Sequence, residues 1–166
     1  MTLKELNILI RDCTECSKGP KELGWGTPEK ILFVGQCPTQ NSVEKIGGES
    51  NFDLFFLDLL ARIGITEKDF YFTNAVKIPK RTYDLSIEEQ DHFLGHLLDE
   101  IVLIKPKLII ALGNSAKVSL QRGRQKFIHI MHPASLKYKG SIYRKLLISE
   151  LKKIQTKYER IRKKIS

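Results

Sequence analysis

Short apolar runs alternate with amphipathic helical segments along this chain, and that alternation constrains the fold more than any other feature. Four runs are short and rich in β-branched or aromatic residues, as buried strands are; they span residues 31–34, 69–73, 107–112 and 126–131. Strands that alternate with helices form βαβ units with right-handed crossovers. The sequence therefore predicts an α/β fold, a doubly wound and mainly parallel sheet of about four strands with helices on both faces, which is an α/β/α sandwich.

The helices between these strands are indicated by apolar spacing and by end signals. Leu3, Leu6 and Ile10 are spaced as on one face of a helix, and Ser86 with Glu89 resembles a capping box that opens a helix to Ile104. Further helices are expected over 52–63, 116–120 and a C-terminal stretch from 143 to 161, whereas 39–51 is expected to be a loop. The long C-terminal helix ends in a run of basic residues at 160–164.

Length and charge narrow the class of protein. A chain of 166 residues is expected to form a single domain, residues 1–166. It has neither the apolar run of about 20 residues that spans a bilayer nor a signal peptide, so we expect a cytoplasmic protein without a membrane partner. We also expect a monomer. The 28 Lys and Arg against 19 Asp and Glu give a net charge of +9, which favours a polyanionic partner. A solvated basic surface is the alternative.

Two polar turns follow predicted strands directly. Residues 35–39 read GQCPT after the first strand, and residues 132–136 read HPASL after the last. Open α/β folds bind ligands outside the carboxyl ends of their strands, so both turns are expected to border one crevice. No G-x-G-x-x-G or Walker sequence follows the first strand, which argues against a nucleotide-binding domain of the usual kinds.

Five segments in order resemble the motifs of the uracil-DNA glycosylase superfamily, and most closely its iron–sulfur branch, family 4. They are Gly35-Gln-Cys-Pro-Thr39, Asn51-Phe-Asp53, Thr73-Asn-Ala-Val-Lys77, Leu112-Gly-Asn-Ser-Ala116 and His132-Pro-Ala134. The resemblance runs over nearly the whole chain. It implies an enzyme that hydrolyses the N-glycosidic bond of uracil in DNA and leaves an abasic site.

The resemblance implies a role for each residue of the base pocket. His132 would donate a hydrogen bond, as neutral imidazole, to the uracil that departs with negative charge. Phe52 would stack on the flipped base, and Asn74 would read its Watson–Crick edge. A plain core Phe and a turn-forming Asn are the alternatives for the last two. Substrate contacts are also expected from Gly35 and from the backbone amides of Gln36 and Cys37.

A second set of residues is expected to contact DNA. Leu136 falls where the superfamily inserts an apolar wedge at the vacated base position. Lys137 lies beside it, and Lys80 and Arg81 would line the same groove. The segment with Asn114 and Ser115 opens a helix that could hold a phosphate, an ordinary helix cap being the alternative.

The chain departs from family 4 at the residue that activates water, because Gln36 stands where that family has Glu. Loss of a general base typically costs about 10²–10⁴ in rate. Gln36 can still position water or base, and Glu44, Glu49 and Asp53 in the adjacent loop are possible substitutes for the missing carboxylate. We therefore expect a monofunctional glycosylase whose activity is weaker or narrower than that of the family. The alternative is a weak or inactive member that binds uracil-containing or single-stranded DNA.

The cluster ligands of that branch are also incomplete. Cys13 and Cys16 form a C-x2-C pair, but Ile78 occupies the third expected position. A [4Fe–4S] cluster needs four ligands, so we do not expect the usual one, and the glycosylase chemistry requires no cofactor. His92 and His96 lie four residues apart near the fourth position, and with the two cysteines they would form a Cys2His2 zinc set. A thiol pair packed without metal is the alternative.

Overall fold

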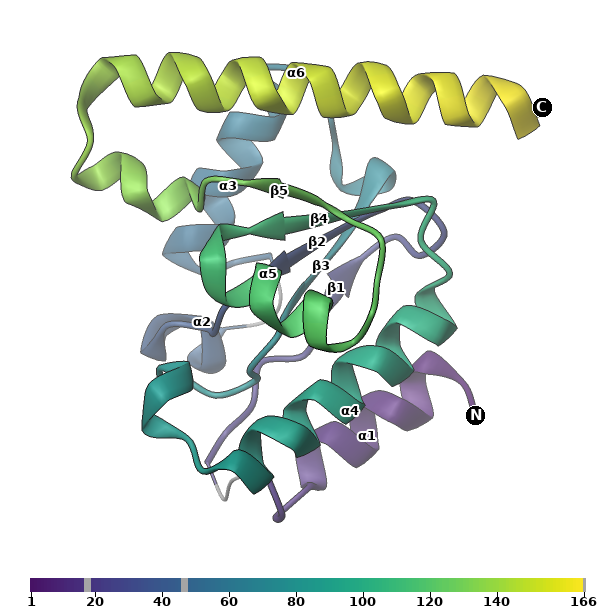
Figure 1. The fold of residues 1–166 in the computed structure, drawn as a ribbon, viewed down its shortest axis with the longest axis vertical. Coiled ribbons are helices and arrows are strands. Elements are labelled where there is room, and N and C mark those ends of the chain that lie inside the picture. Colours follow the sequence, from purple (N-terminus) through teal and green to yellow (C-terminus); the bar gives the residue numbers. More distant parts are fainter. Residues whose placement is uncertain (17–18, 46–47, 166) are drawn as a thin grey trace.

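The computed structural model describes residues 1–16, 19–45 and 48–165 and contains a five-stranded sheet (Figure 1). The strands lie in the order β1-β3-β2-β4-β5, with bounds Trp25–Gly26 (β1), Ile31–Gly35 (β2), Phe70–Asn74 (β3), Leu108–Leu112 (β4) and Ile128–Ile130 (β5). The last four run parallel, which confirms the predicted α/β fold. The remaining strand, β1, lies at the edge of the sheet beside β3 and was not predicted. It has two residues, pairs antiparallel with β3, and lies among glycines where no periodicity can reveal it.

Helices cover both faces of this sheet. The α-helices are Leu3–Asp12 (α1), Gln40–Glu44 (α2), Asn51–Ala61 (α3), Ile87–Ile104 (α4), Gly113–Arg122 (α5) and Gly140–Ile165 (α6). One face packs against α3 and α6, and the other against α4 and α5, with α1 lying against α4. Figure 1 shows α6 crossing one side of the sheet and the α1–α4 pair on the opposite side.

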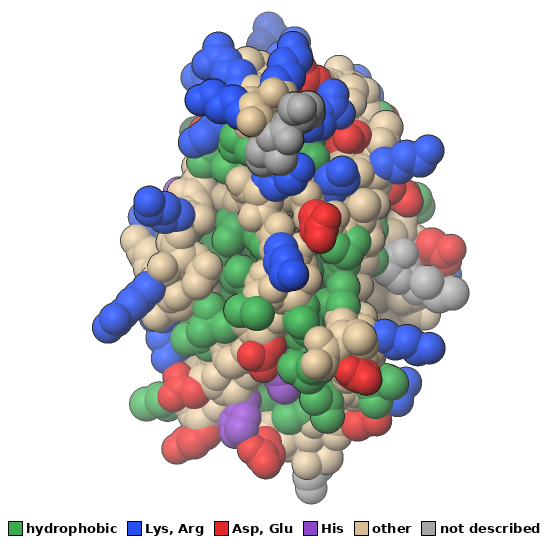
Figure 2. All heavy atoms as spheres, turned by 90° about the vertical axis from the view of Figure 1, so that its right-hand side faces the viewer, with side chains coloured by type: hydrophobic (Ala, Val, Ile, Leu, Met, Phe, Trp, Pro, Cys, Tyr) green, Lys and Arg blue, Asp and Glu red, His purple; other side chains and the backbone are tan. Residues whose placement is uncertain are grey.

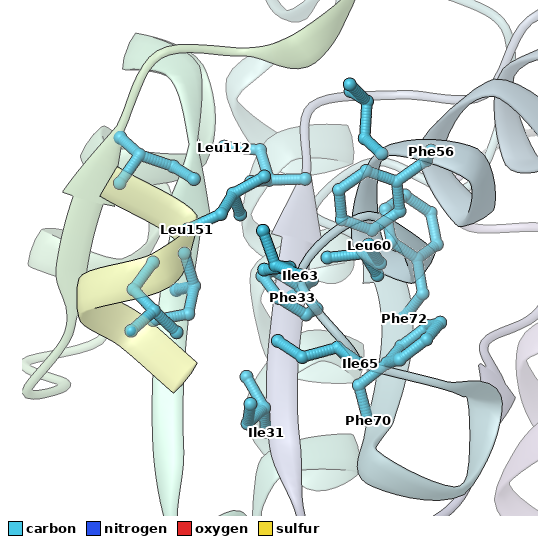
Figure 3. Packing of buried hydrophobic residues seen from close by; sticks show 14 of the residues in the cluster. Ile31, Phe33, Phe56, Leu60, Ile63, Ile65, Phe70, Phe72, Leu112 and Leu151 are labelled. Atoms are coloured by element: carbon cyan, nitrogen blue, oxygen red, sulfur yellow. The ribbon is translucent and has the colours of Figure 1, made fainter. Parts of the chain in front are cut away.

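The central strand β2 shows how the sequence builds both cores. Ile31 and Phe33 point to the α3 and α6 side, while Leu32 and Val34 point to the α4 and α5 side. All four are fully buried, as expected for a strand covered on both faces. Figure 3 shows Phe33 at the centre of the first core, between Leu151 of α6 and the side chains of α3. This packing holds β2 rigidly, and with it the turn that follows.

Helix starts agree with the sequence signals in part. Ser86 accepts from the backbone N–H of Glu89 and the Glu89 carboxylate accepts from that of Ser86, so the predicted capping box is confirmed. The expected loop over 39–51 contains the short helix α2, which begins after Thr39, while residues 46 and 47 of that loop lie outside the described residues. Helix α5 begins at Gly113 with no side-chain cap, so the alternative of capping by Asn114 or Ser115 is wrong.

The basic residues are distributed unevenly. Figure 2 views the molecule from the right-hand side of Figure 1. On this face most Lys and Arg side chains gather at the upper end, and Asp and Glu are more frequent at the lower end. The end of α6 carries Arg160, Arg162, Lys163 and Lys164. In Figure 1 that end lies opposite to the side at which the arrowheads of β2 and β4 point, so part of the excess charge faces away from the carboxyl edge of the sheet. None of the described helices is both long and apolar enough to cross a membrane.

Candidate active site

The register of the sheet brings the predicted site segments together. Gly35, the last residue of β2, pairs with Asn74, the last residue of β3. On the other side of β2, β4 pairs with β5, which ends two residues before His132. Three turns from distant parts of the chain thus meet at the carboxyl edge of one parallel sheet, the edge at which such folds bind ligands.

These turns enclose a cavity of about 70 Å³. Four residues predicted for the base pocket line it, namely Cys37, Phe52, Asn74 and His132. The other lining residues are Glu22, Pro38, Thr39, Ser42 and Ala134. The imidazole of His132 and the carboxamide of Asn74 therefore face one common space.

The surroundings of His132 fix which of its nitrogens carries the proton. The backbone N–H of Ala134 donates to Nδ1 at 3.1 Å, so Nδ1 acts as an acceptor. Burial lowers the pKa of this imidazole to about 4, and it is therefore neutral at physiological pH. A neutral imidazole with an accepting Nδ1 carries its proton on Nε2. His132 thus offers a single N–H donor without a positive charge.

Phe52 belongs to both the core and the cavity. It lies in the first turn of α3, whose start is fixed by a buried capping box between Ser50 and Asp53. Its ring is half-buried, stacks on Phe56 with centroids 5.8 Å apart, and lies 5.4 Å from the ring of His132. The pocket side of Phe52 is thus an aromatic surface held in place by the core behind it.

Asn74 is held from two sides. Its Nδ2 donates to the buried carboxylate of Glu22 at 2.7 Å. Its Oδ1 lies against Gly35, where an added Cβ would come within 2.4 Å of that oxygen. The absence of a side chain at position 35 therefore leaves room for the carboxamide.

A buried ion pair supports the end of β3 from behind. Lys77 and Glu100 are both fully buried and form a salt bridge. The ammonium of Lys77 also donates to the hydroxyl of Thr73 and to the carbonyl of Asn74, the latter at 2.7 Å. These bonds join the backbone of Asn74 to helix α4 and leave the Asn74 side chain to face the cavity.

The side chain of Gln36 lies outside the cavity, although it was expected to position water or the base. Its side chain does not line the cavity but a larger groove of about 620 Å³, where its Nε2 lies 3.5 Å from the Thr82 hydroxyl. Successive residues after Gly35 point in different directions, so Cys37 faces the cavity and Gln36 faces the groove. This geometry therefore directs the Gln36 side chain away from a base bound in the cavity.

The larger groove brings together three of the residues expected to contact DNA. Arg81, Asn114 and Ser115 line it, together with Arg122. The guanidinium of Arg81 bonds to the hydroxyl of Tyr83 and lies over its ring. The exposed Arg81 and the first turn of α5 supply the positive charge and N–H donors that a phosphate needs.

The remaining candidates for DNA contact lie outside that groove. Lys80 lies 3.9 Å from the carboxylate of Glu89. Leu136 and Lys137 lie in a short 3-10 helix, Pro133–Lys137 (η3), that directly follows His132. Lys137 is exposed, whereas Leu136 is half-buried against the first core. Tyr138, which follows, is 88% exposed.

The predicted metal ligands are partly assembled. Ligand atoms of Cys13, Cys16 and His96 all lie within 4.8 Å of one another. His92 is not part of this group, because its Nε2 lies 2.9 Å from the carboxylate of Glu15. The expected Cys2His2 set is therefore wrong at His92.

The third expected cluster position is occupied by an apolar residue. Ile78 packs in an apolar cluster with Cys16, Val76 and Phe93. The described residues thus bring three donors together, which does not fit a [4Fe–4S] cluster held by four protein ligands. Three such donors do match a zinc ion with one open position. The buried Nε2 of His96 has no hydrogen-bond partner among the described residues and is available to a metal.

Glu22 is a cavity residue with an ionisable side chain that the sequence did not reveal. It lies in an irregular segment between Gly19 and Gly24, outside every motif discussed above. It is 6% exposed. Burial, and next the charge of Asp53, raise its pKa to about 7. Nothing in the local sequence indicates that this loop folds back over the end of β3.

Comparison with known proteins agrees with this geometry. The Type-4 uracil-DNA glycosylase of Thermotoga maritima is 26% identical to this chain, over 89% of this chain and 90% of the relative. That of Archaeoglobus fulgidus is 28% identical, over 92% of both chains. The Type-4 uracil-DNA glycosylase of Pyrobaculum aerophilum is 28% identical over 68% of this chain, which spans 61% of that relative. The family model described as Uracil DNA glycosylase superfamily matches residues 25–153. The chain therefore belongs to the uracil-DNA glycosylase superfamily.

Proposed function

We propose that this protein is a monofunctional uracil-DNA glycosylase, which hydrolyses the bond between uracil and deoxyribose and leaves an abasic site. The observation that carries the proposal is the single cavity shared by His132, Asn74 and Phe52. An aromatic face, an amide and an uncharged N–H donor are the three groups that a flipped pyrimidine requires. Family membership and the names of the three relatives point to the same substrate.

The cavity residues suggest a path for the reaction. The base leaves the DNA stack, rests on Phe52, and presents its N3 and O4 edge to Asn74. The electron pair of the C1′–N1 bond departs with uracil, and Nε2–H of His132 stabilises the negative charge at O2. Water adds to the oxocarbenium-like C1′ and loses a proton. Because Gln36 faces the groove, no general base is assigned, and the reaction relies on leaving-group stabilisation.

The proposed partner is DNA, bound along the groove that Arg81, Asn114 and Ser115 line and at η3. Lys80 and Lys137 would add phosphate contacts, and Leu136 would occupy the space left by the flipped base. The proposal takes the protein to be a cytoplasmic monomer, as its sequence predicts. A sedimentation-equilibrium mass of one chain is expected, and a mass of two chains would contradict the monomer.

The experiment uses an oligonucleotide with one uracil, treated with alkali after incubation to break abasic sites. Wild type should give a single cut at the uracil, and His132→Ala should slow cleavage by about 100-fold or more. His129→Ala is the matched control, since this exposed residue lies two positions earlier on β5. Absence of cleavage by folded wild type would overturn the function. Salt-dependent binding without base release would indicate the DNA-binding alternative.

We also propose that Cys13, Cys16 and His96 hold a zinc ion whose fourth position is open. The three donors and their mutual distances support it. Elemental analysis should find about one zinc per chain. His96→Gln should lose it, whereas the control His92→Gln should retain it. Iron with inorganic sulfide, or a protein that is purified without metal and takes up no added zinc, would contradict this assignment.

A further inference from the structure

The reaction path above leaves one buried group in the cavity without a role, the carboxyl group of Glu22. The residue is held at its backbone, where its N–H donates to the carbonyl of Lys77 at 2.8 Å. Its Oε2 accepts from Nδ2 of Asn74 at 2.7 Å. Its Oε1 is buried and has no hydrogen-bond partner among the described residues. Glu22 therefore lies at the end of the cavity where Asn74 reads the base.

An ionised carboxylate constrains the amide that it contacts. Its two oxygens only accept hydrogen bonds, so an amide beside it must present NH₂ rather than oxygen. The two ends of a carboxamide have nearly the same shape, and without such a partner they can exchange by a half-turn. In this cavity Nδ2 faces Glu22 and Oδ1 lies against Gly35. The ionised Glu22 thus permits one of the two orientations.

The orientation of an amide decides which pyrimidine edge it pairs with. Uracil presents an N3–H donor beside the O4 acceptor, while cytosine presents the N3 acceptor beside an N4 amine donor. A fixed amide matches one of these edges, and an amide that turns can match either. We propose that Glu22 is a positioning residue that fixes the Asn74 carboxamide and thereby makes the cavity select uracil over cytosine. This inference rests on the proposed function.

The ionisation of Glu22 makes this selection depend on pH. Burial is the largest cause of the rise in the pKa of Glu22 to about 7, and the charge of Asp53 on α3 raises it further. Lys77 and the amide of Asn74 lower this pKa. Cys37 and His132 also line this cavity. Above pH 7 the carboxylate accepts only. Below pH 7 the protonated carboxyl can also donate to Oδ1, so the amide can turn and selection weakens.

The first test compares release of uracil and cytosine from oligonucleotides that differ at that one base. In Glu22→Gln, whose amide both donates and accepts, the cytosine-to-uracil ratio of kcat/KM should rise at least about 10-fold at pH 8. The wild-type ratio should fall from pH 6 to pH 8, whereas the variant's ratio should stay level. The matched control is Glu67→Gln, which removes an exposed carboxylate just before β3, at the other end of that strand from Asn74. An unchanged ratio in Glu22→Gln, or an equal change in Glu67→Gln, would overturn the inference.

The second test needs no enzymatic activity. The side-chain amide protons of Asn74, assigned by their loss in Asn74→Asp, should shift in NMR spectra with a midpoint near pH 7. That titration should be absent in Glu22→Gln. Asn74 signals that do not move between pH 5.5 and 8.5 would overturn the inference, even if uracil is released. Titration of these signals without any base release would refute the proposed function and leave the contact standing.

Discussion

At the scale of single residues, the chemistry of the site depends on what surrounds each side chain. The histidine after the last strand and its neutral form were both expected from the sequence, but the contacts that set its protonation were not. The backbone N–H of Ala134 makes Nδ1 an acceptor, and burial lowers the pKa to about 4. The neutral imidazole donates one hydrogen bond to the position where negative charge develops on the leaving group.

The depressed pKa of His132 has a consequence for stability. An unfolded histidine titrates near pH 6.5, so between about pH 6.5 and pH 4 the unfolded chain binds this proton more readily than the folded chain. Stability should therefore fall as the pH falls through this window, by up to about 1.4 kcal/mol per pH unit from this residue.

Urea unfolding at pH 7 and pH 5 measures that dependence. The fall in stability between the two should be smaller in His132→Gln than in wild type. The raised pKa of Glu22 acts in the opposite sense in both proteins and cancels in the comparison. His129→Gln, at an exposed position, should behave as wild type. If stability depends on pH equally in His132→Gln and wild type, the pKa of the His132 imidazole is not lowered by folding.

Gly35 tests the space around Asn74. In Gly35→Ala the new Cβ would meet Oδ1 of Asn74 at 2.4 Å, so the carboxamide must move. We expect kcat/KM for uracil release to fall at least about 10-fold, because displacements of about 1 Å in a positioned group have effects of this size or larger. Gly95→Ala is the control: its Cβ meets nothing within 4 Å, and stability should rise by about 0.5–1 kcal/mol. Unchanged activity in Gly35→Ala would mean that Asn74 is not a reading group.

At the scale of elements, strands and capped helices could be predicted because their signals are local. The capping box at Ser86 and the apolar spacing of α6 are contained within a few turns of chain. The two-residue strand β1 and the five-residue helix α2 could not be predicted, since each is too short for its periodic pattern to repeat. Glu22 was missed for a different reason. Its contact with Asn74 joins residues 52 positions apart, and neither residue type indicates the other.

The buried pair of Lys77 and Glu100 predicts a strong dependence of stability on one carboxylate. Both side chains are fully buried, so Glu100→Leu leaves an ammonium without its counter-charge. Removing one member of a buried pair typically costs about 3–5 kcal/mol. Urea unfolding should show this loss, and the double variant Lys77→Met/Glu100→Leu should recover most of it. A loss below about 1 kcal/mol in Glu100→Leu would contradict the importance of this pair.

At the scale of the whole molecule, net charge does not say where the nucleic acid lies. The end of α6 carries several of the basic residues, yet it lies on the side away from the carboxyl edge of the sheet (Figure 1). The groove beside the cavity has few basic residues, among them Arg81 and Arg122. We therefore expect position, rather than amount of charge, to decide which residues bind phosphates.

The salt dependence of DNA binding distinguishes these two regions. Each phosphate contact contributes about 0.9 to the slope of log K against log salt. Lys80→Gln/Arg81→Gln should reduce the slope by about 1–2, whereas Lys163→Gln/Lys164→Gln, with the same loss of charge, should leave it nearly unchanged. An equal reduction by both pairs would indicate that DNA also contacts the end of α6.

A crystal structure of the protein with free uracil shows whether the small cavity at the carboxyl ends of the parallel strands recognises this base. We predict that the ring lies against Phe52, with its N3 and O4 edge on Asn74 and its O2 within hydrogen-bond distance of Nε2 of His132. Uracil bound in the groove beside Arg81, or a cavity that stays empty at saturating uracil, would contradict the account.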